Sequence, residues 1–259
     1  MHHQGSLTVH QFPCLNDNYG FLVRDKASGT TAAIDTPDGE DIIKQAEALS
    51  WTIDLILNTH WHPDHIGGND RIAEHFGAKV YAPEAEGDKI AHKSRALKDG
   101  DTVMLGETAL QVIGVPGHTL GHIAYYAPSA EAAFVGDTLF SLGCGRLFEG
   151  TPEEMWTSLL KLRALPAETT IFCAHEYTAA NAAFALSVDD KNKALQARAD
   201  EVTRLRAEGK PTVPVILSNE IATNPFLRAD DPMLAASVGR EGAPHHEVFA
   251  EIRARKDQF

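Results

Sequence analysis

The sequence predicts an α/β protein in which packed sheets are flanked by helices, followed by a smaller helical domain. Up to about residue 175, short apolar strand patterns alternate with turn residues and a few helical segments. Beyond that point strand patterns nearly vanish and helical spacing dominates. This order favours packed sheets over a doubly wound parallel sheet. We therefore expect one domain at residues 1–175 and a helical C-terminal domain at residues 176–259.

The predicted elements follow hydrophobic periodicity and turn signals along the chain. The strands are Leu7–Phe12, Tyr19–Val23, Thr31–Asp35, Ile53–Leu57, Lys79–Ala82, Thr102–Leu105, Ala109–Val115, Ile123–Tyr126, Ala132–Val135 and Thr169–Cys173. The helices are Glu40–Ser50, Asn69–Phe76, Thr151–Leu165, Tyr177–Val188, Lys191–Glu208 and His245–Lys256. The clearest start is Thr151-Pro152-Glu153-Glu154, with threonine as N-cap, proline at the first helical position and glutamate three after the cap.

Composition limits the functions that this chain can have. Of its 259 residues 43% are apolar and 23% charged, the balance of an ordinary globular protein. The net charge of −13 repels nucleic acid and anionic membranes, so an anionic substrate needs a local basic patch. No apolar run approaches the ~18 residues that cross a bilayer. The three cysteines are far apart, without a CxxC pattern, which favours a reducing compartment. We expect a cytoplasmic monomer that binds neither nucleic acid nor membranes.

Four potential metal ligands lie within six residues at the end of the strand Ile53–Leu57: His60, His62, Asp64 and His65. His60 and His62 are two apart in an extended segment, so their rings can converge on one ion. Asp64 and His65 follow Pro63, where the chain changes direction, and therefore point elsewhere. Lone histidines usually have structural roles, but a cluster of four potential ligands in six residues predicts a metal site.

Three further candidates each follow a predicted strand: His118, Asp137 and His175. Seven N and O donors exceed what one tetrahedral ion takes, but two ions that share a carboxylate would use all seven. This arrangement puts His60, His62 and His118 on one ion, Asp64, His65 and His175 on the other, and Asp137 between them. A ligand set without thiolate suits two divalent ions, with zinc as the first expectation and iron or manganese as alternatives.

The segment Thr-His-Trp-His-Pro-Asp-His at 59–65 resembles the signature of the metallo-β-lactamase superfamily, and His118, Asp137 and His175 follow in the order that the superfamily uses. The resemblance implies an αββα sandwich with the metal ions at one edge. Further segments resemble the glyoxalase II, or hydroxyacylglutathione hydrolase, family within it. They are Asn16–Tyr19, Gly143–Arg146, Glu149–Thr151, His175–Thr178, Asn224–Arg228 and Lys256–Phe259.

This family resemblance implies hydrolysis of S-D-lactoylglutathione to D-lactate and glutathione, the second step of methylglyoxal detoxification. It places Arg146, Tyr177, Arg253 and Lys256 at positions that contact glutathione in the family. Phe148 departs from the pattern, because some members have a tyrosine there. Other roles remain open: Arg253 and Lys256 could form a solvated helix face, and Tyr177 could cap a helix.

The expected reaction is attack of a metal-bound hydroxide on the thioester carbonyl, with Asp64 and Asp137 as the catalytic carboxylates. Cys173 is two residues from His175, but a free cysteine more often packs as a small apolar residue. A rival in another enzyme class is a glutathione persulfide dioxygenase with a single iron, which would need fewer ligands. A metal-binding scaffold and a β-lactamase are weaker alternatives.

Overall fold

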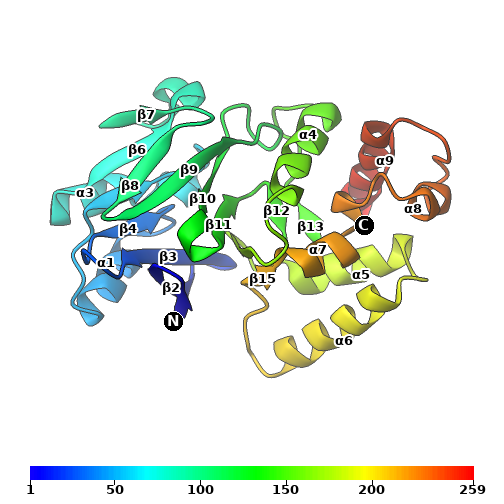
Figure 1. Cartoon of the computed structure of the whole chain (residues 1–259), viewed down its shortest axis with the longest axis horizontal. Coiled ribbons are helices and arrows are strands. Elements are labelled where there is room, and N and C mark those ends of the chain that lie inside the picture. The colour runs from blue at the N-terminus through cyan, green and yellow to red at the C-terminus, as the bar shows by residue number, and fades with distance from the viewer. The chain divides into compact units, whose positions relative to one another are not determined.

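The computed structural model describes all 259 residues, and the chain forms two compact units. The first unit comprises Met1–Gly114 and Thr119–Gly136, and the second comprises Val115–His118 and Asp137–Phe259. Figure 1 labels most of the helices and strands of both units. The domain boundary after residue 175 stays a prediction. None of the helices combines the length and the apolar character needed to cross a bilayer.

The first unit is built on a mixed sheet of seven strands in sequence order. Its first four strands pair antiparallel, and the fourth to seventh pair parallel. They are β1 (His2–Gln4), β2 (Leu7–Cys14), β3 (Asn18–Asp25), β4 (Thr31–Ile34), β5 (Leu55–Leu57), β6 (Lys79–Pro83) and β7 (Arg95–Leu97).

Helices cover one face of this sheet. They are α1 (Gly39–Ala48) and α3 (Asn69–Phe76), with the single-turn α2 (Pro63–Ile66) before α3. Asp38 caps α1 by accepting a hydrogen bond from the Asp41 amide. The apolar side of α1, with Ile42 and Ala46, packs in one core with Ile56 of β5. Burial of these side chains fixes the helices on the sheet.

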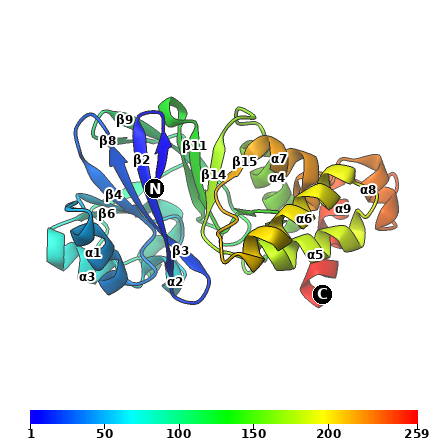
Figure 2. The same cartoon turned by 90° about the horizontal axis from the view of Figure 1, so that it is seen from below.

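A second, antiparallel sheet covers the opposite face of the first. Its strands are β8 (Thr102–Leu105), β9 (Thr108–Gly114), β10 (Ile123–Ala127) and β11 (Ala132–Gly136). The rings of Phe21 in β3 and Phe134 in β11 meet edge to face, with centroids 5.9 Å apart. The hydroxyl of Tyr125 donates to the carbonyl of Asn58 at 2.7 Å. Figure 2 shows the resulting layers, with α1 and α3 below, β4 and β6 between, and β8 and β9 above.

The second unit is mainly helical. It contains α4 (Pro152–Arg163), α5 (Thr178–Val188), α6 (Lys193–Ala207), α7 (Leu217–Thr223), α8 (Pro232–Ser237) and α9 (His245–Gln258). Two short antiparallel pairs complete it: β12 (Leu139–Phe140) with β13 (Gly143–Cys144), and β14 (Thr170–Cys173) with β15 (Val215–Ile216). The rings of Trp156, Phe226 and Phe249 pack α4 and α9 together around the 3₁₀ turn Pro225–Leu227.

The structure confirms the predicted strands and longer helices to within a few residues at their ends. The capping box that begins α4 is present, with Thr151 and Glu154 bonded to each other's backbone. The predictions missed several elements: β1, β7, β12, β13, β15, α2, α7 and α8. All of these are two to seven residues long, too short for a periodic pattern to develop.

Candidate active site

The histidine-rich segment leaves β5 and becomes α2 almost at once. His62 is the N-cap of α2 in an extended conformation, and Pro63 occupies the first helical position. Asp64 and His65 therefore lie on a helical turn, whereas His60 and His62 lie on the extended chain before it. Nε2 of His60 is 3.0 Å from Nδ1 of His62. The predicted change of direction after Pro63 is thus made by one turn of helix.

Buried side chains fix the rings of His60 and His65 through one nitrogen each. Nδ1 of His60 lies 3.0 Å from the hydroxyl of Thr59, and Nδ1 of His65 lies 2.8 Å from Oδ2 of Asp35. The Asp35 carboxylate also accepts hydrogen bonds from the amide and hydroxyl of Thr59, both at 2.8 Å. A histidine that donates one ring nitrogen to a carboxylate presents the other to a metal. The sequence prediction missed Asp35, although it directly follows β4.

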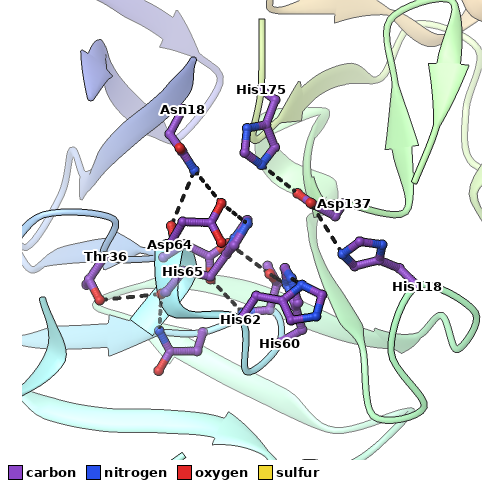
Figure 3. A network of polar contacts seen from close by, with 12 residues as sticks. Asn18, Thr36, His60, His62, Asp64, His65, His118, Asp137 and His175 are labelled. Atoms are coloured by element: carbon purple, nitrogen blue, oxygen red, sulfur yellow. Dashed lines mark hydrogen bonds and ion pairs between the residues drawn. The ribbon is translucent and has the colours of Figure 1, made fainter. Parts of the chain in front are cut away.

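Asn18, at the start of β3, holds Asp64 in place. Its amide nitrogen donates to Oδ2 of Asp64 at 3.0 Å and to the Asp64 carbonyl at 3.3 Å. Oδ2 of Asp64 is also 3.5 Å from Nε2 of His65. In the sequence, Asn18 is distinguished only by its place in Asn16–Tyr19, a segment similar to the glyoxalase II family. These contacts, drawn in Figure 3, orient the four clustered donors within the first unit.

The second unit brings the other three predicted ligands together. Oδ2 of Asp137 lies 3.4 Å from Nε2 of His118, and Oδ1 lies 3.4 Å from Nε2 of His175 (Figure 3). Nδ1 of His118 is bonded to the carbonyl of Arg146 at 2.8 Å, which fixes the ring. All three side chains are buried. The two oxygens of one carboxylate therefore face two different histidines, the geometry that a bridging ligand needs.

The distances of 3.4 Å from the Asp137 oxygens to His118 and His175 fit two ligands of one metal ion better than hydrogen bonds. A good N–H···O bond has its heavy atoms 2.7–3.2 Å apart. Two ligands bound at about 2.1 Å in a tetrahedral site lie about 3.4 Å from each other. Burial raises the pKa of Cys173 to about 12 and that of Cys144 to about 11, so neither thiol supplies a thiolate at neutral pH. The donors are imidazole and carboxylate, which suit zinc, iron or manganese.

A cavity of about 510 Å³ opens within the second unit. Its walls include two of the predicted ligands, His118 and Asp137. The same walls carry all five predicted substrate contacts: Arg146, Phe148, Tyr177, Arg253 and Lys256. The structure thus gathers residues from separate parts of the sequence around one space. Their role in substrate binding stays a prediction at this point.

The aromatic residues of the cavity lie against the ligand histidines. The ring of Tyr177 stacks on His175 at 4.7 Å with an interplanar angle of 2°. The ring of Phe148 meets His118 at 5.2 Å and is 63% exposed. An exposed phenylalanine offers an apolar surface to a bound molecule but no hydroxyl. The Phe148 side chain therefore offers a packing surface and no hydrogen bond.

The three cations differ in how freely they can reach a ligand. Arg253 is only 5% exposed and donates to the Cys144 carbonyl at 3.0 Å. Lys256 is partly buried between the rings of Phe184 and Phe259. Burial, followed by the nearby charge of Arg253, lowers the pKa of Lys256 from its usual value. Arg146 has a side chain that is 66% exposed.

The chain matches two family models that together span most of its length. Residues 21–175 match the metallo-beta-lactamase superfamily, and residues 176–259 match the hydroxyacylglutathione hydrolase C-terminus. A hydroxyacylglutathione hydrolase from Erythrobacter litoralis (strain HTCC2594) is 58% identical over 98% of this chain and all of that relative. The chain belongs to the hydroxyacylglutathione hydrolase family. It is accordingly an enzyme of the hydrolase class with the metallo-β-lactamase fold, as its sequence predicts.

Solved structures of known proteins agree on the fold. ETHE1 from Myxococcus xanthus aligns with a TM-score of 0.66 over 96% of this chain and 98% of its own, at 22% identity. TTHA1623, solved in a di-iron-bound form, aligns with a TM-score of 0.60 over 85% of this chain and all of its own, at 25% identity. Membership of the family rests on the sequence matches, and the first of these structures supports the fold alone.

Proposed function

We propose that this enzyme hydrolyses the thioester bond of 2-hydroxyacylglutathiones, above all S-D-lactoylglutathione, to give D-lactate and glutathione. The observation that carries the proposal is the cavity of the second unit. Its walls hold two predicted metal ligands together with Arg146, Arg253 and Lys256. A molecule with a thioester and two carboxylates needs both kinds of group, and the whole chain, at −13, otherwise repels anions. The reaction belongs to the detoxification of methylglyoxal.

We propose further that the ligands of the two units combine around two divalent ions. The first ion would bind His60, His62 and His118, the second Asp64, His65 and His175, and Asp137 would bridge them. Two findings support this: the oxygens of Asp137 face different histidines, and TTHA1623, a similar chain, was solved in a di-iron-bound form. Zinc is the metal we expect first, with iron or manganese as alternatives.

In this proposal the metal ions supply hydroxide at neutral pH and a positive charge that polarises the carbonyl oxygen. The protein's own groups supply orientation. Asp64, held by Asn18, accepts a hydrogen bond from the attacking water and directs it. Arg146 and Lys256 pair with the glutathione carboxylates, while Phe148 and Tyr177 pack along the peptide. The leaving thiolate has a pKa near 8.5 and departs without strong acid assistance.

The wider setting of the enzyme is also a proposal. All three cysteines are free and buried, in keeping with a reducing compartment, and we propose that the protein works in the cytoplasm as a monomer. We propose no nucleic-acid or membrane partner. We also propose a domain boundary at 175/176, where one family match ends and the other begins.

Parallel assays on one purified preparation test the proposed function. S-D-lactoylglutathione hydrolysis would be followed with metal analysis, and oxygen uptake with glutathione persulfide. We expect rapid hydrolysis, close to two ions per chain and no oxygen uptake. Oxygen uptake with a single iron per chain and negligible hydrolysis would instead establish the persulfide dioxygenase.

A further inference from the structure

The cavity of the second unit contains a carboxylate that the proposed reaction does not use. Apart from the predicted ligand Asp137, the only acidic side chain in its walls is Asp257. Asp257 lies next to Lys256 on α9, within the terminal segment Lys256–Phe259 that resembles the family. The resemblance assigns it no role in the reaction or in substrate binding. An acidic group among three cations either neutralises them or binds a positive charge of its own.

The contacts of Asp257 engage one of its two oxygens. Oδ1 accepts a hydrogen bond from Nη2 of Arg253 at 2.9 Å and lies 3.7 Å from Nε of Arg146. Oδ2 makes no hydrogen bond or ion pair with the protein, and the side chain is 44% exposed. Arg253 is itself buried and bonded to the Cys144 carbonyl, so it holds Oδ1 in a defined position. The second oxygen remains available to a ligand.

We propose that Asp257 binds the free α-ammonium group of the γ-glutamyl residue of the substrate. This inference rests on the proposed function, because it concerns the same glutathione thioester. Glutathione carries two carboxylates and one ammonium group near neutral pH. The cavity offers Arg146 and Lys256 for the carboxylates and Asp257, held by Arg253, for the ammonium group. Binding a primary ammonium requires an acceptor, and leaving it among three cations would cost binding free energy.

Two other roles of Asp257 make different predictions. As a mask, it would occupy Arg146 and Arg253, and its removal would improve binding of any glutathione thioester. As a brace, it would hold Arg253 and α9 in place, and its removal would weaken binding of all substrates equally. As an ammonium receptor, it should matter only while the substrate has its free amine. The amine of the substrate is therefore the variable to change.

The test combines Asp257→Asn with S-D-lactoylglutathione and its N-acetylated form, in which the γ-glutamyl amine is an amide. Asparagine keeps an oxygen for Arg253 but loses the charge. We expect N-acetylation to raise the KM of the wild-type holoenzyme about three- to tenfold, as for a partly exposed charge-assisted contact. Asp257→Asn should raise the KM for the native substrate by a similar factor and should add little for the acetylated one. The kcat should stay within about twofold, because the contact is remote from the thioester.

Glu251→Gln is the matched control. Glu251 lies on the same helix, pairs with Arg240 and Arg255, and is outside the cavity. Like Asp257→Asn, the Glu251→Gln substitution removes one negative charge from α9. We expect it to leave the KM for the native and the acetylated substrate unchanged. Inhibition by glutathione and by N-acetylglutathione gives a second readout that is independent of turnover, with the same pattern expected.

Each of the other outcomes would overturn the inference, and each has a different explanation. A lower KM of Asp257→Asn for both substrates would identify a mask, and an equal rise for both would identify a brace. If N-acetylation left the KM of the wild-type enzyme unchanged, Asp257 would not bind the ammonium group, whereas the proposed function would still stand. If wild-type enzyme with its metal hydrolyses neither substrate, the proposed function fails and this inference with it.

Discussion

The two sets of predicted metal ligands are held in different ways. In the first unit the ligands are neighbours in sequence, and the side chains of Thr59, Asp35 and Asn18 fix them. In the second unit the ligands are far apart in sequence, and a backbone carbonyl and ring stacking hold them. The first set can therefore be disturbed by substituting residues that are not ligands. The second is tied to the walls of the cavity, so changes there should affect the substrate as well.

Removal of metal should have the largest effect, because it acts on both ligand sets at once. A chelator should abolish hydrolysis, since the pKa of water that is not bound to a metal lies far above neutral pH. Added zinc, iron or manganese should restore it, with activity levelling off close to two ions per chain. Metal analysis during titration of the apoenzyme measures this. Full activity at one ion per chain would show that only one of the two proposed metal sites is needed for catalysis.

Breaking only the second set should come next. Asp137→Ala removes the carboxylate shared by His118 and His175. We expect a loss of at least about a thousandfold in kcat, together with lower metal content. Steady-state kinetics and metal analysis of the same sample measure both. If the variant retained two ions and near-wild-type activity, Asp137 would not be the bridge.

Breaking only the support of the first set should have an intermediate effect. Asp35→Asn keeps the size of the side chain but weakens the acceptor for Nδ1 of His65. Loss of such a partner lowers metal affinity by about ten- to a hundredfold. Competition with a chromophoric chelator measures it. Asp25→Asn is the control: Asp25 is also buried in the first unit and bonded to Thr108, but it contacts no predicted ligand. Equal effects from the two would mean that Asp35 matters only for folding.

The contrast between the two sets also explains what the sequence could predict. His60, His62, Asp64 and His65 form a local pattern that needs no knowledge of the fold. Asp35 could not be found in this way. It reaches Thr59, 24 positions along the chain, because β4 and β5 pair parallel with Ala33 opposite Ile56. That register depends on the whole sheet, and no local signal encodes it.

The substrate contacts show the same limit in the second unit. Spacing alone placed Arg253 and Lys256 on one face of a helix, and both do line the cavity. How deeply each side chain is buried was not predicted. Arg253 lies four residues after Phe249, on the buried side of α9, a spacing that could have indicated its burial. The hairpin of β12 and β13, which receives the Arg253 hydrogen bond, has two-residue strands and gave no strand signal.

The last and smallest predicted effect follows from this difference in burial: alanine variants of Lys256 and Arg253 should behave differently. Lys256→Ala removes a partly buried cation and should lower kcat/KM for S-D-lactoylglutathione about tenfold, mainly through KM. A small neutral thioester should be hydrolysed as by the wild type. Arg253→Ala also leaves the buried Cys144 carbonyl without its donor, so it should lower the melting temperature and slow hydrolysis of the neutral thioester too. Kinetics on both substrates and thermal unfolding of both variants measure the difference. If the two variants behaved alike, the burial of Arg253 would have no consequence for the cavity, and both cations would act simply as glutathione contacts.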